Sequence, residues 1–245
     1  MLPRIRFVID INQDIRAYDR FFAERSYDHG RSFRWAVVDY YPRFRSSWRH
    51  GHFVVPHRTM VHFIHQQYEI LVGTMTSNLY QTERAWRRKE QSYDRLVHTL
   101  FFDGDWPRGK YIASPTIWGL CPKFLEDKTF LVPYRRRGGR MVNVVIAHEL
   151  LHFIFDYHFR RWYPQYRQDQ YELLSWHISE LFNTVVQHTK PWIRVFGIGS
   201  TLYPEHRSMF RSLLSAYADH PHWKAKELTD EIVCRVAAWP QFRRS

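Results

Sequence analysis

Two histidines and a glutamate within five residues are the part of this sequence best suited to chemistry. His148, Glu149 and His152 form the pattern His-Glu-x-x-His. On an α-helix, residues four apart lie on one face with Cβ atoms about 5–6 Å apart, so the two imidazoles can bind one metal ion. Glu149 is rotated by about 100° from His148, where it can reach a metal-bound water without binding the metal. The spacing predicts a metal site with a carboxylate as general base.

The residues around this motif are apolar on every side. Residues 141–147 read Met-Val-Asn-Val-Val-Ile-Ala and residues 153–155 read Phe-Ile-Phe. This pattern predicts a buried helix over about 141–161. Buried histidine and glutamate side chains are costly unless something satisfies them, and a metal ion does so. A pair of hydrogen-bonded core histidines is the alternative, and we favour the metal site.

From the motif outward, the segment 128–190 resembles the zincin metallopeptidases. In that family an edge strand precedes the motif helix, and a later helix supplies the third metal ligand. We expect the same order here, with a strand at 128–134, the motif helix at 141–161 and a helix at 170–189. The resemblance implies a zinc-dependent metallopeptidase that hydrolyses peptide bonds in a peptide or protein substrate.

The resemblance also implies a fold class. We expect an α+β, zincin-like fold, in which a small mixed or antiparallel β-sheet precedes the motif helix and the C-terminal half is mostly helical. The whole chain, 1–245, is expected to be one domain. Its N-terminal lobe, 1–140, would hold the sheet, and 141–245 would hold the motif helix, the glutamate helix and a helical tail.

A glutamate on the helix after the motif is the expected third ligand, as in the gluzincin branch of the family. Glu180 lies mid-helix among Trp176, Leu181 and Phe182, where a carboxylate requires a partner. Glu172 is closer to the spacing in thermolysin-like enzymes. It falls in the first helical turn, however, where the helix dipole alone explains an acidic residue. We expect Glu180 as the ligand, with Glu172 as the alternative.

Two other residues after the motif are alternative candidates for the third ligand. His158 stands at the metzincin position, but Phe155 replaces the glycine that ends the motif helix there. The helix should therefore continue and turn His158 away from the metal. Asp156 shares the stripe of the two histidines but lies about 12 Å along the axis from His148, so we expect it in a salt bridge or behind a ligand.

Residues three before and three after Glu180 share its helix face. We predict that His177 stabilises the oxyanion of the tetrahedral intermediate and that Asn183 orients a ligand. An ordinary helix-surface histidine and asparagine fit the pattern equally well. Other possible oxyanion donors are Tyr157, Tyr163 and Tyr171.

The remaining histidines carry weaker signals. His57, His62 and His65 cluster before a helix, and in a chain with 15 histidines we interpret this as coincidence. His220 and His222 are similar to the third-ligand segment of SprT-like, DNA-associated metalloproteases. They follow the motif by about 70 residues, much further than in that family.

The formal net charge of +12 suggests an anionic partner. Basic segments at 135–140 and 84–89 could attract nucleic acid, although for 84–89 we favour an exposed helix face with Trp86 packed inward. A nucleic-acid-binding protein with a structural or vestigial zinc site is therefore the alternative function, as is a SprT-like protease acting on DNA-associated proteins. We expect nucleic-acid contact to be weak and electrostatic.

Composition and patterning exclude several other classes. Two cysteines, Cys121 and Cys234, cannot build a disulfide framework or a cysteine-based zinc module. The first ten residues lack the apolar core of a signal peptide, and no stretch approaches the roughly 18 apolar residues of a membrane span. We expect a cytoplasmic protein without membrane contact.

Apolar spacing and chain breakers predict the other elements. They are a strand at 4–9, a helix at 10–24, a strand at 33–40, two helices or one long bent helix over 57–102, a strand at 110–114, and a helical tail at 205–245 broken at Pro221.

Overall fold

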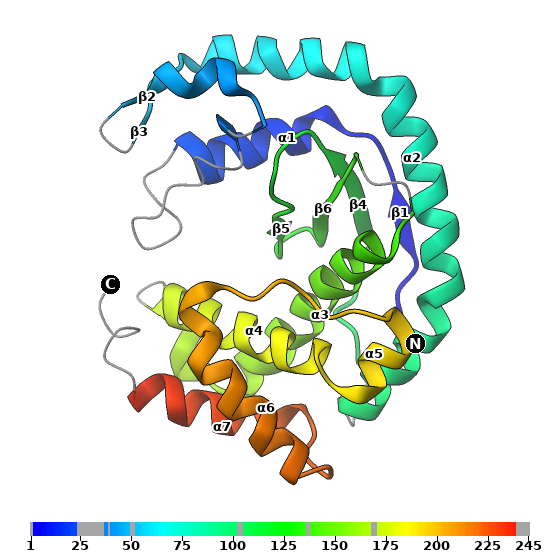
Figure 1. The fold of residues 1–245 in the computed structure, drawn as a ribbon, viewed down its shortest axis with the longest axis vertical. Helices are drawn as coiled ribbons and strands as arrows, with labels where there is room; N and C mark the ends of the chain where they lie inside the picture. Colours follow the sequence, from blue (N-terminus) through cyan, green and yellow to red (C-terminus); the bar gives the residue numbers. More distant parts are fainter. Residues whose placement is uncertain are drawn as a thin grey trace. The chain divides into compact units, whose positions relative to one another are not determined.

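A computed structural model gives the structure of this chain and describes residues 2–23, 37–38, 40–49, 52–101, 105–135, 138–167 and 171–238. The chain divides into two compact units (Figure 1). The sheet unit consists of residues 4–84 and 110–142, and the helical unit of residues 1–3, 85–109 and 143–245. The fold is mixed α/β and mostly helical, as expected. The zincin-like arrangement and the single domain stay predictions.

A four-stranded sheet lies in the sheet unit, with the strand order β1-β4-β6-β5. The strands are β1 (Ile5–Phe7), β4 (Tyr111–Thr116), β5 (Lys123–Phe124) and β6 (Thr129–Pro133). β1 and β6 both run parallel to β4, whereas β5 pairs antiparallel with β6. The sheet is therefore mixed, which was one of the two expected arrangements. Nearly every residue of β4 and β6 is buried, as is typical of parallel strands.

The first helix, α1 (Ile11–Tyr18), begins where Asp10 caps it by accepting a hydrogen bond from the Asn12 backbone N–H at 3.0 Å. It continues as a π-helical turn, Asp19–Ala23. A 3₁₀ turn, Pro42–Ser47, leads into a short antiparallel pair that the sequence did not predict, β2 (Trp48–Arg49) and β3 (His52–Phe53). The strand expected at 33–40 lies largely outside the described residues.

The core of the sheet unit is rich in aromatic rings and, among its described residues, contains one fully buried carboxylate. Asp14 of α1 accepts hydrogen bonds from the Tyr68 hydroxyl at 2.9 Å, the Thr116 hydroxyl at 2.5 Å and the Ile117 backbone N–H at 2.9 Å. Burial raises the pKa of Asp14 to about 7, although these three hydrogen bonds lower it. Asp14 thus ties α1 to the end of β4 and to the helix that carries Tyr68.

That helix, α2 (His57–Leu100), is a single element of 44 residues. It contains no proline and one glycine, and the expectation of one long helix is confirmed over that of two. Its residues 57–84 belong to the sheet unit and its residues 85–100 to the helical unit. Trp86 is fully buried, with its ring centroid 5.4 Å from that of Tyr93, so the inward-facing interpretation of Trp86 is confirmed.

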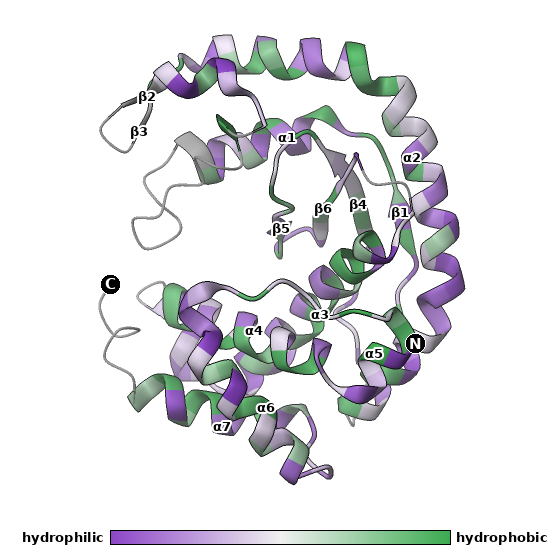
Figure 2. Ribbon diagram, in the orientation of Figure 1, coloured by the Kyte–Doolittle hydropathy of each residue, from purple (hydrophilic) through white to green (hydrophobic). Residues whose placement is uncertain are grey.

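Two buried helices, α3 and α4, form the centre of the helical unit. The helices here are α3 (Arg140–Trp162), whose first three residues belong to the sheet unit, α4 (Glu172–Gln187), α5 (Lys190–Phe196), α6 (Arg207–Asp219) and α7 (Ala225–Ala238). Within this unit α4 packs against α5, α6 and α7. Hydrophobic residues run along much of α3 and α4 (Figure 2). In the described part of the chain, no helix is both long enough and apolar enough to cross a membrane.

Candidate metal centre

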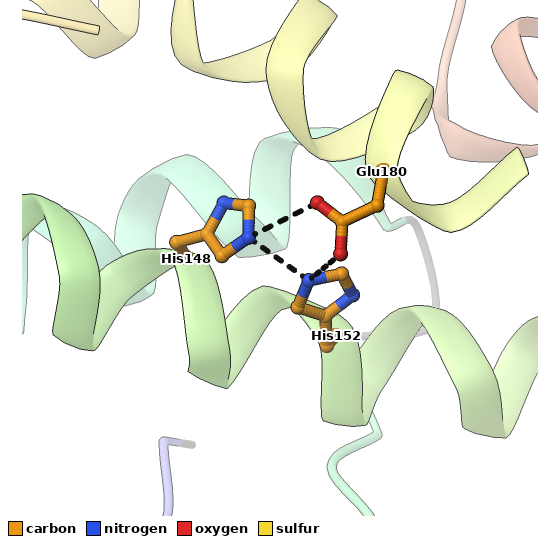
Figure 3. Close-up of side chains that lie close together, drawn as sticks. All are labelled: His148, His152 and Glu180. Carbon is orange, nitrogen blue, oxygen red and sulfur yellow. Dashed lines mark hydrogen bonds and ion pairs between the residues drawn. The ribbon is translucent and has the colours of Figure 1, made fainter. Parts of the chain in front are cut away.

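The two motif histidines project from one face of α3. Their Nε2 atoms face one another (Figure 3) and lie 3.0 Å apart. The ring of His152 is almost completely buried. Most apolar residues of α3 are buried, as the sequence predicted, and the helical spacing brings both imidazoles to one point.

The glutamate that meets the histidines comes from α4. Glu180 Oε1 lies 3.2 Å from His152 Nε2, and Glu180 Oε2 lies 3.4 Å from His148 Nε2 (Figure 3). The Glu180 residue is only 3% exposed. Glu172 lies in the first turn of α4 and does not belong to this group of three.

These separations fit a small metal ion. Ligands at about 2.1 Å from a tetrahedral metal lie about 3.4 Å from one another. The nitrogen and oxygen atoms here are 3.0, 3.2 and 3.4 Å apart in the contacts just given. His148, His152 and Glu180 are the one group of three or more potential metal-ligating side chains among the described residues. The three side chains therefore form a possible metal-binding triad.

Each histidine ring is also held at its second nitrogen, by a residue of α4. His148 Nδ1 lies 3.0 Å from Gln187 Oε1, and His152 Nδ1 lies 2.6 Å from Ser179 Oγ. Such outer partners orient metal-binding imidazoles. Sequence reasoning missed both residues. Gln187 lies seven residues after Glu180 and thus on the same helix face, and this spacing was the signal that could have identified it.

The charge of Glu180 affects its histidine neighbour. Burial lowers the pKa of His148, but the hydrogen bond and the charge of Glu180 raise it, so that the pKa lies above its ordinary value. A proton on His148 can thus offset the buried carboxylate when no metal is present. Proton and metal ion compete for the same nitrogen.

The sequence suggested that Asn183 orients a ligand. In the structure Asn183 contacts the backbone of His148, one of the two motif histidines. Its Nδ2 donates to the His148 backbone carbonyl at 3.3 Å, and the residue is fully buried. Because Asn183 belongs to α4, this bond holds the motif helix against the glutamate helix.

The two residues predicted to act on substrate are both buried in the helical unit. Glu149 lies on α3 and is 6% exposed. His177 is 1% exposed, and its Nδ1 lies 2.8 Å from His206 Nε2. Trp176 packs against the His177 ring with centroids 4.8 Å apart. The base role of Glu149 and the oxyanion role of His177 stay predictions.

The alternative ligands on α3 have other contacts. The helix continues through Phe155 to Trp162, as the missing glycine predicted. His158 is buried, and its ring is stacked on Phe101 at 5.1 Å. Asp156 forms a salt bridge with Arg160 at 2.9 Å, in agreement with the salt-bridge interpretation.

The outlying histidines also have local partners. His57 Nε2 lies 2.9 Å from Asp19 Oδ1, and the His220 ring stacks on Trp223 with centroids 4.5 Å apart. The tyrosines suggested as oxyanion donors include Tyr163, whose hydroxyl donates to Asp230. Part of the arginine run at 135–140 lies outside the described residues.

Comparison with known proteins identifies no relative. No protein-family model, no curated protein and no solved structure matches the chain. What the protein does is therefore inferred from its own side chains.

Proposed function

We propose that this protein is a zinc-dependent metallopeptidase. The observation that carries the proposal is the meeting of three ligand atoms from two helices, His148 Nε2, His152 Nε2 and a Glu180 oxygen, at separations of 3.0–3.4 Å. These residues stand around a His-Glu-x-x-His motif, whose glutamate is spaced to act beside the metal.

The donor set favours zinc over magnesium and calcium. Two imidazole nitrogens and one carboxylate oxygen are the ligands of catalytic zinc sites that keep a fourth position open. Magnesium and calcium prefer sites made of oxygen atoms alone. The hydrogen bonds from Gln187 and Ser179 to the far ring nitrogens support the same proposal, because metal-binding histidines commonly have such partners.

The residues divide the chemistry between them. Zinc, when bound, lowers the pKa of a coordinated water toward about 7 and polarises the scissile carbonyl. Glu149 takes the proton of the attacking water and passes it to the leaving amine. His177 is the residue we assign to the oxyanion. The substrate is a peptide or a protein.

The test is metal content and peptide cleavage, measured on the wild type and on Glu149→Gln. We expect one zinc per chain in both proteins, because Glu149 is not a ligand. Cleavage should fall by about 10²–10⁴-fold in Glu149→Gln, because the variant cannot take up the proton. Wild-type protein purified without chelator that contains no stoichiometric metal would contradict the proposal.

A further inference from the structure

We propose that Gln187 and Ser179 position the two histidines in different ways: Gln187 holds His148 in a single tautomer, whereas Ser179 supports both tautomers of His152. Both residues belong to α4, the helix that also carries Glu180. The inference deepens the proposed function and rests on the metal site described there. A neutral histidine ring carries its hydrogen on either Nδ1 or Nε2, and Nε2 can bind a metal only when the hydrogen is on Nδ1.

Gln187 presents an acceptor to His148. Its Oε1 lies 3.0 Å from His148 Nδ1, and a side-chain amide oxygen can only accept. Nδ1 must therefore carry the hydrogen, which leaves the lone pair of Nε2 directed at His152 and Glu180. Gln187 is fully buried, and the side chain of His148 is 17% exposed. His148 is thus in its metal-binding tautomer before any metal arrives.

Ser179 presents a hydroxyl, which can donate or accept. In the metal-free protein, at a pH where both rings are neutral, His148 Nε2 is an acceptor 3.0 Å from His152 Nε2, and Glu180 Oε1 is another at 3.2 Å. His152 Nε2 therefore carries a hydrogen and donates it to one of them. His152 Nδ1 is then bare and accepts from the Ser179 hydroxyl at 2.6 Å.

Metal binding requires the opposite form of His152. Its Nε2 must lose the hydrogen, and Nδ1 must gain one, so the ring remains neutral throughout. Ser179 then accepts from Nδ1 instead of donating to it. The Nε2 hydrogen leaves to solvent as a proton when the metal binds, and a proton from solvent attaches to Nδ1. The Ser179 hydroxyl hydrogen rotates away from the ring, and the same two heavy atoms remain hydrogen-bonded. The site can therefore switch between a metal-free and a metal-binding form without moving a side chain.

The direct test is ¹⁵N NMR of the histidine side chains, at an alkaline pH where both rings are neutral, before and after one equivalent of zinc. We expect His148 to be the Nδ1–H tautomer in both states. His152 should change from Nε2–H to Nδ1–H when zinc is added. A metal-free protein with His148 as Nε2–H, or with His152 already as Nδ1–H, would overturn the inference.

Variants of Gln187 give a matched pair. Gln187→Met keeps the length of the side chain but removes the acceptor, so His148 should become a mixture of tautomers and zinc should bind about 10–100-fold more weakly. Gln187→Glu retains an acceptor, and we expect it to preserve the Nδ1–H form and zinc affinity within a few-fold. Equal affinities of these two variants would contradict the role of Gln187.

Ser179 has a control on its own helix. Ser179→Ala removes the partner of His152 Nδ1 and should weaken zinc binding about 10-fold. Ser175 lies four residues earlier and donates to the Tyr166 backbone carbonyl at 3.4 Å, so Ser175→Ala should leave the affinity unchanged. Far-UV circular dichroism identifies any variant that fails to fold. A folded Ser179→Ala variant with wild-type affinity would contradict the role of Ser179.

The two proposals fail in different ways. Protein that binds zinc with the expected tautomers but cleaves no peptide would refute the metallopeptidase and leave the positioning residues in place. Protein that binds zinc and cleaves peptides, but whose His152 tautomer is the same with and without zinc, would refute the inference alone. The metal-free tautomer of His148 can be measured whether or not zinc binds.

Discussion

Asp14 in the sheet unit and Glu180 in the helical unit are the two most deeply buried carboxylate residues that the structure describes, and they have different neighbours. Asp14, in the sheet unit, is surrounded by hydrogen donors: the hydroxyls of Tyr68 and Thr116 and the backbone N–H of Ile117. Glu180, in the helical unit, lies against the Nε2 atoms of His148 and His152. Both residues are at most 3% exposed, so burial does not distinguish them.

The identity of the neighbouring atoms makes the distinction. The donors around Asp14 already satisfy its oxygens, so its environment is complete as a structural hydrogen-bond network. Around Glu180, ring nitrogens and carboxylate oxygens lie together, and both are metal ligands. When no cation is present, these nitrogen and oxygen atoms compete for the few hydrogens available among them. A buried carboxylate therefore indicates a metal site when other potential metal ligands surround it, and not when hydroxyl and backbone N–H groups do. The variants below test this distinction, from the largest expected effect to the smallest.

Removing the Asp14 carboxylate should have the largest effect, and on stability alone. Asp14→Ala leaves three buried donors without their acceptor, each of which costs about 1–3 kcal/mol. We expect the free energy of unfolding, measured by urea denaturation, to fall by about 3–5 kcal/mol. Zinc content should remain at the wild-type level under conditions where the variant is folded. A loss of zinc from folded Asp14→Ala would show that the two carboxylates are not independent.

Removing the Glu180 carboxylate should act chiefly on the metal. Glu180→Ala deletes one of three ligands, and we expect zinc affinity to fall by at least about 100-fold, the upper end of the loss seen when an outer partner is removed. Glu172→Ala is the matched control on the same helix and should bind zinc normally. Competition with a chromophoric chelator measures both affinities. Zinc loss from Glu172→Ala but not from Glu180→Ala would reverse the ligand assignment.

The raised pKa of Asp14 should also make the stability of the protein depend on pH. Burial raises the pKa of Asp14 from 3.8 to about 7, so between these pH values the folded protein retains a proton that the unfolded chain releases. This group therefore stabilises the fold at low pH, and its contribution is lost as pH rises toward 7, by up to about 1.4 kcal/mol per pH unit. Asp14→Asn should lack this slope. Urea denaturation of both proteins across this range measures it, and parallel profiles would contradict it.

Local patterns were enough to predict much of the helical unit. Apolar residues around the motif predicted the buried helix α3, and four-residue spacing predicted that His148 and His152 share a face. The choice of Glu180 over Glu172 followed from its apolar neighbours on α4. Helix α5 and the two-residue strands β2, β3 and β5 were not predicted, because their short segments carry too little periodicity to stand out.

The sequence by itself thus determined the helices and the faces on which the motif residues lie, because helical periodicity relates residues only three or four positions apart. The tertiary structure alone decided the hydrogen-bond partners. Gln187 meets His148 across 39 positions of sequence, and Thr116 meets Asp14 across 102. Such pairs depend on how α3 packs on α4 and on how α1 packs on β4. Those packings, rather than any local pattern, place acceptors and ligands around one carboxylate and donors around the other.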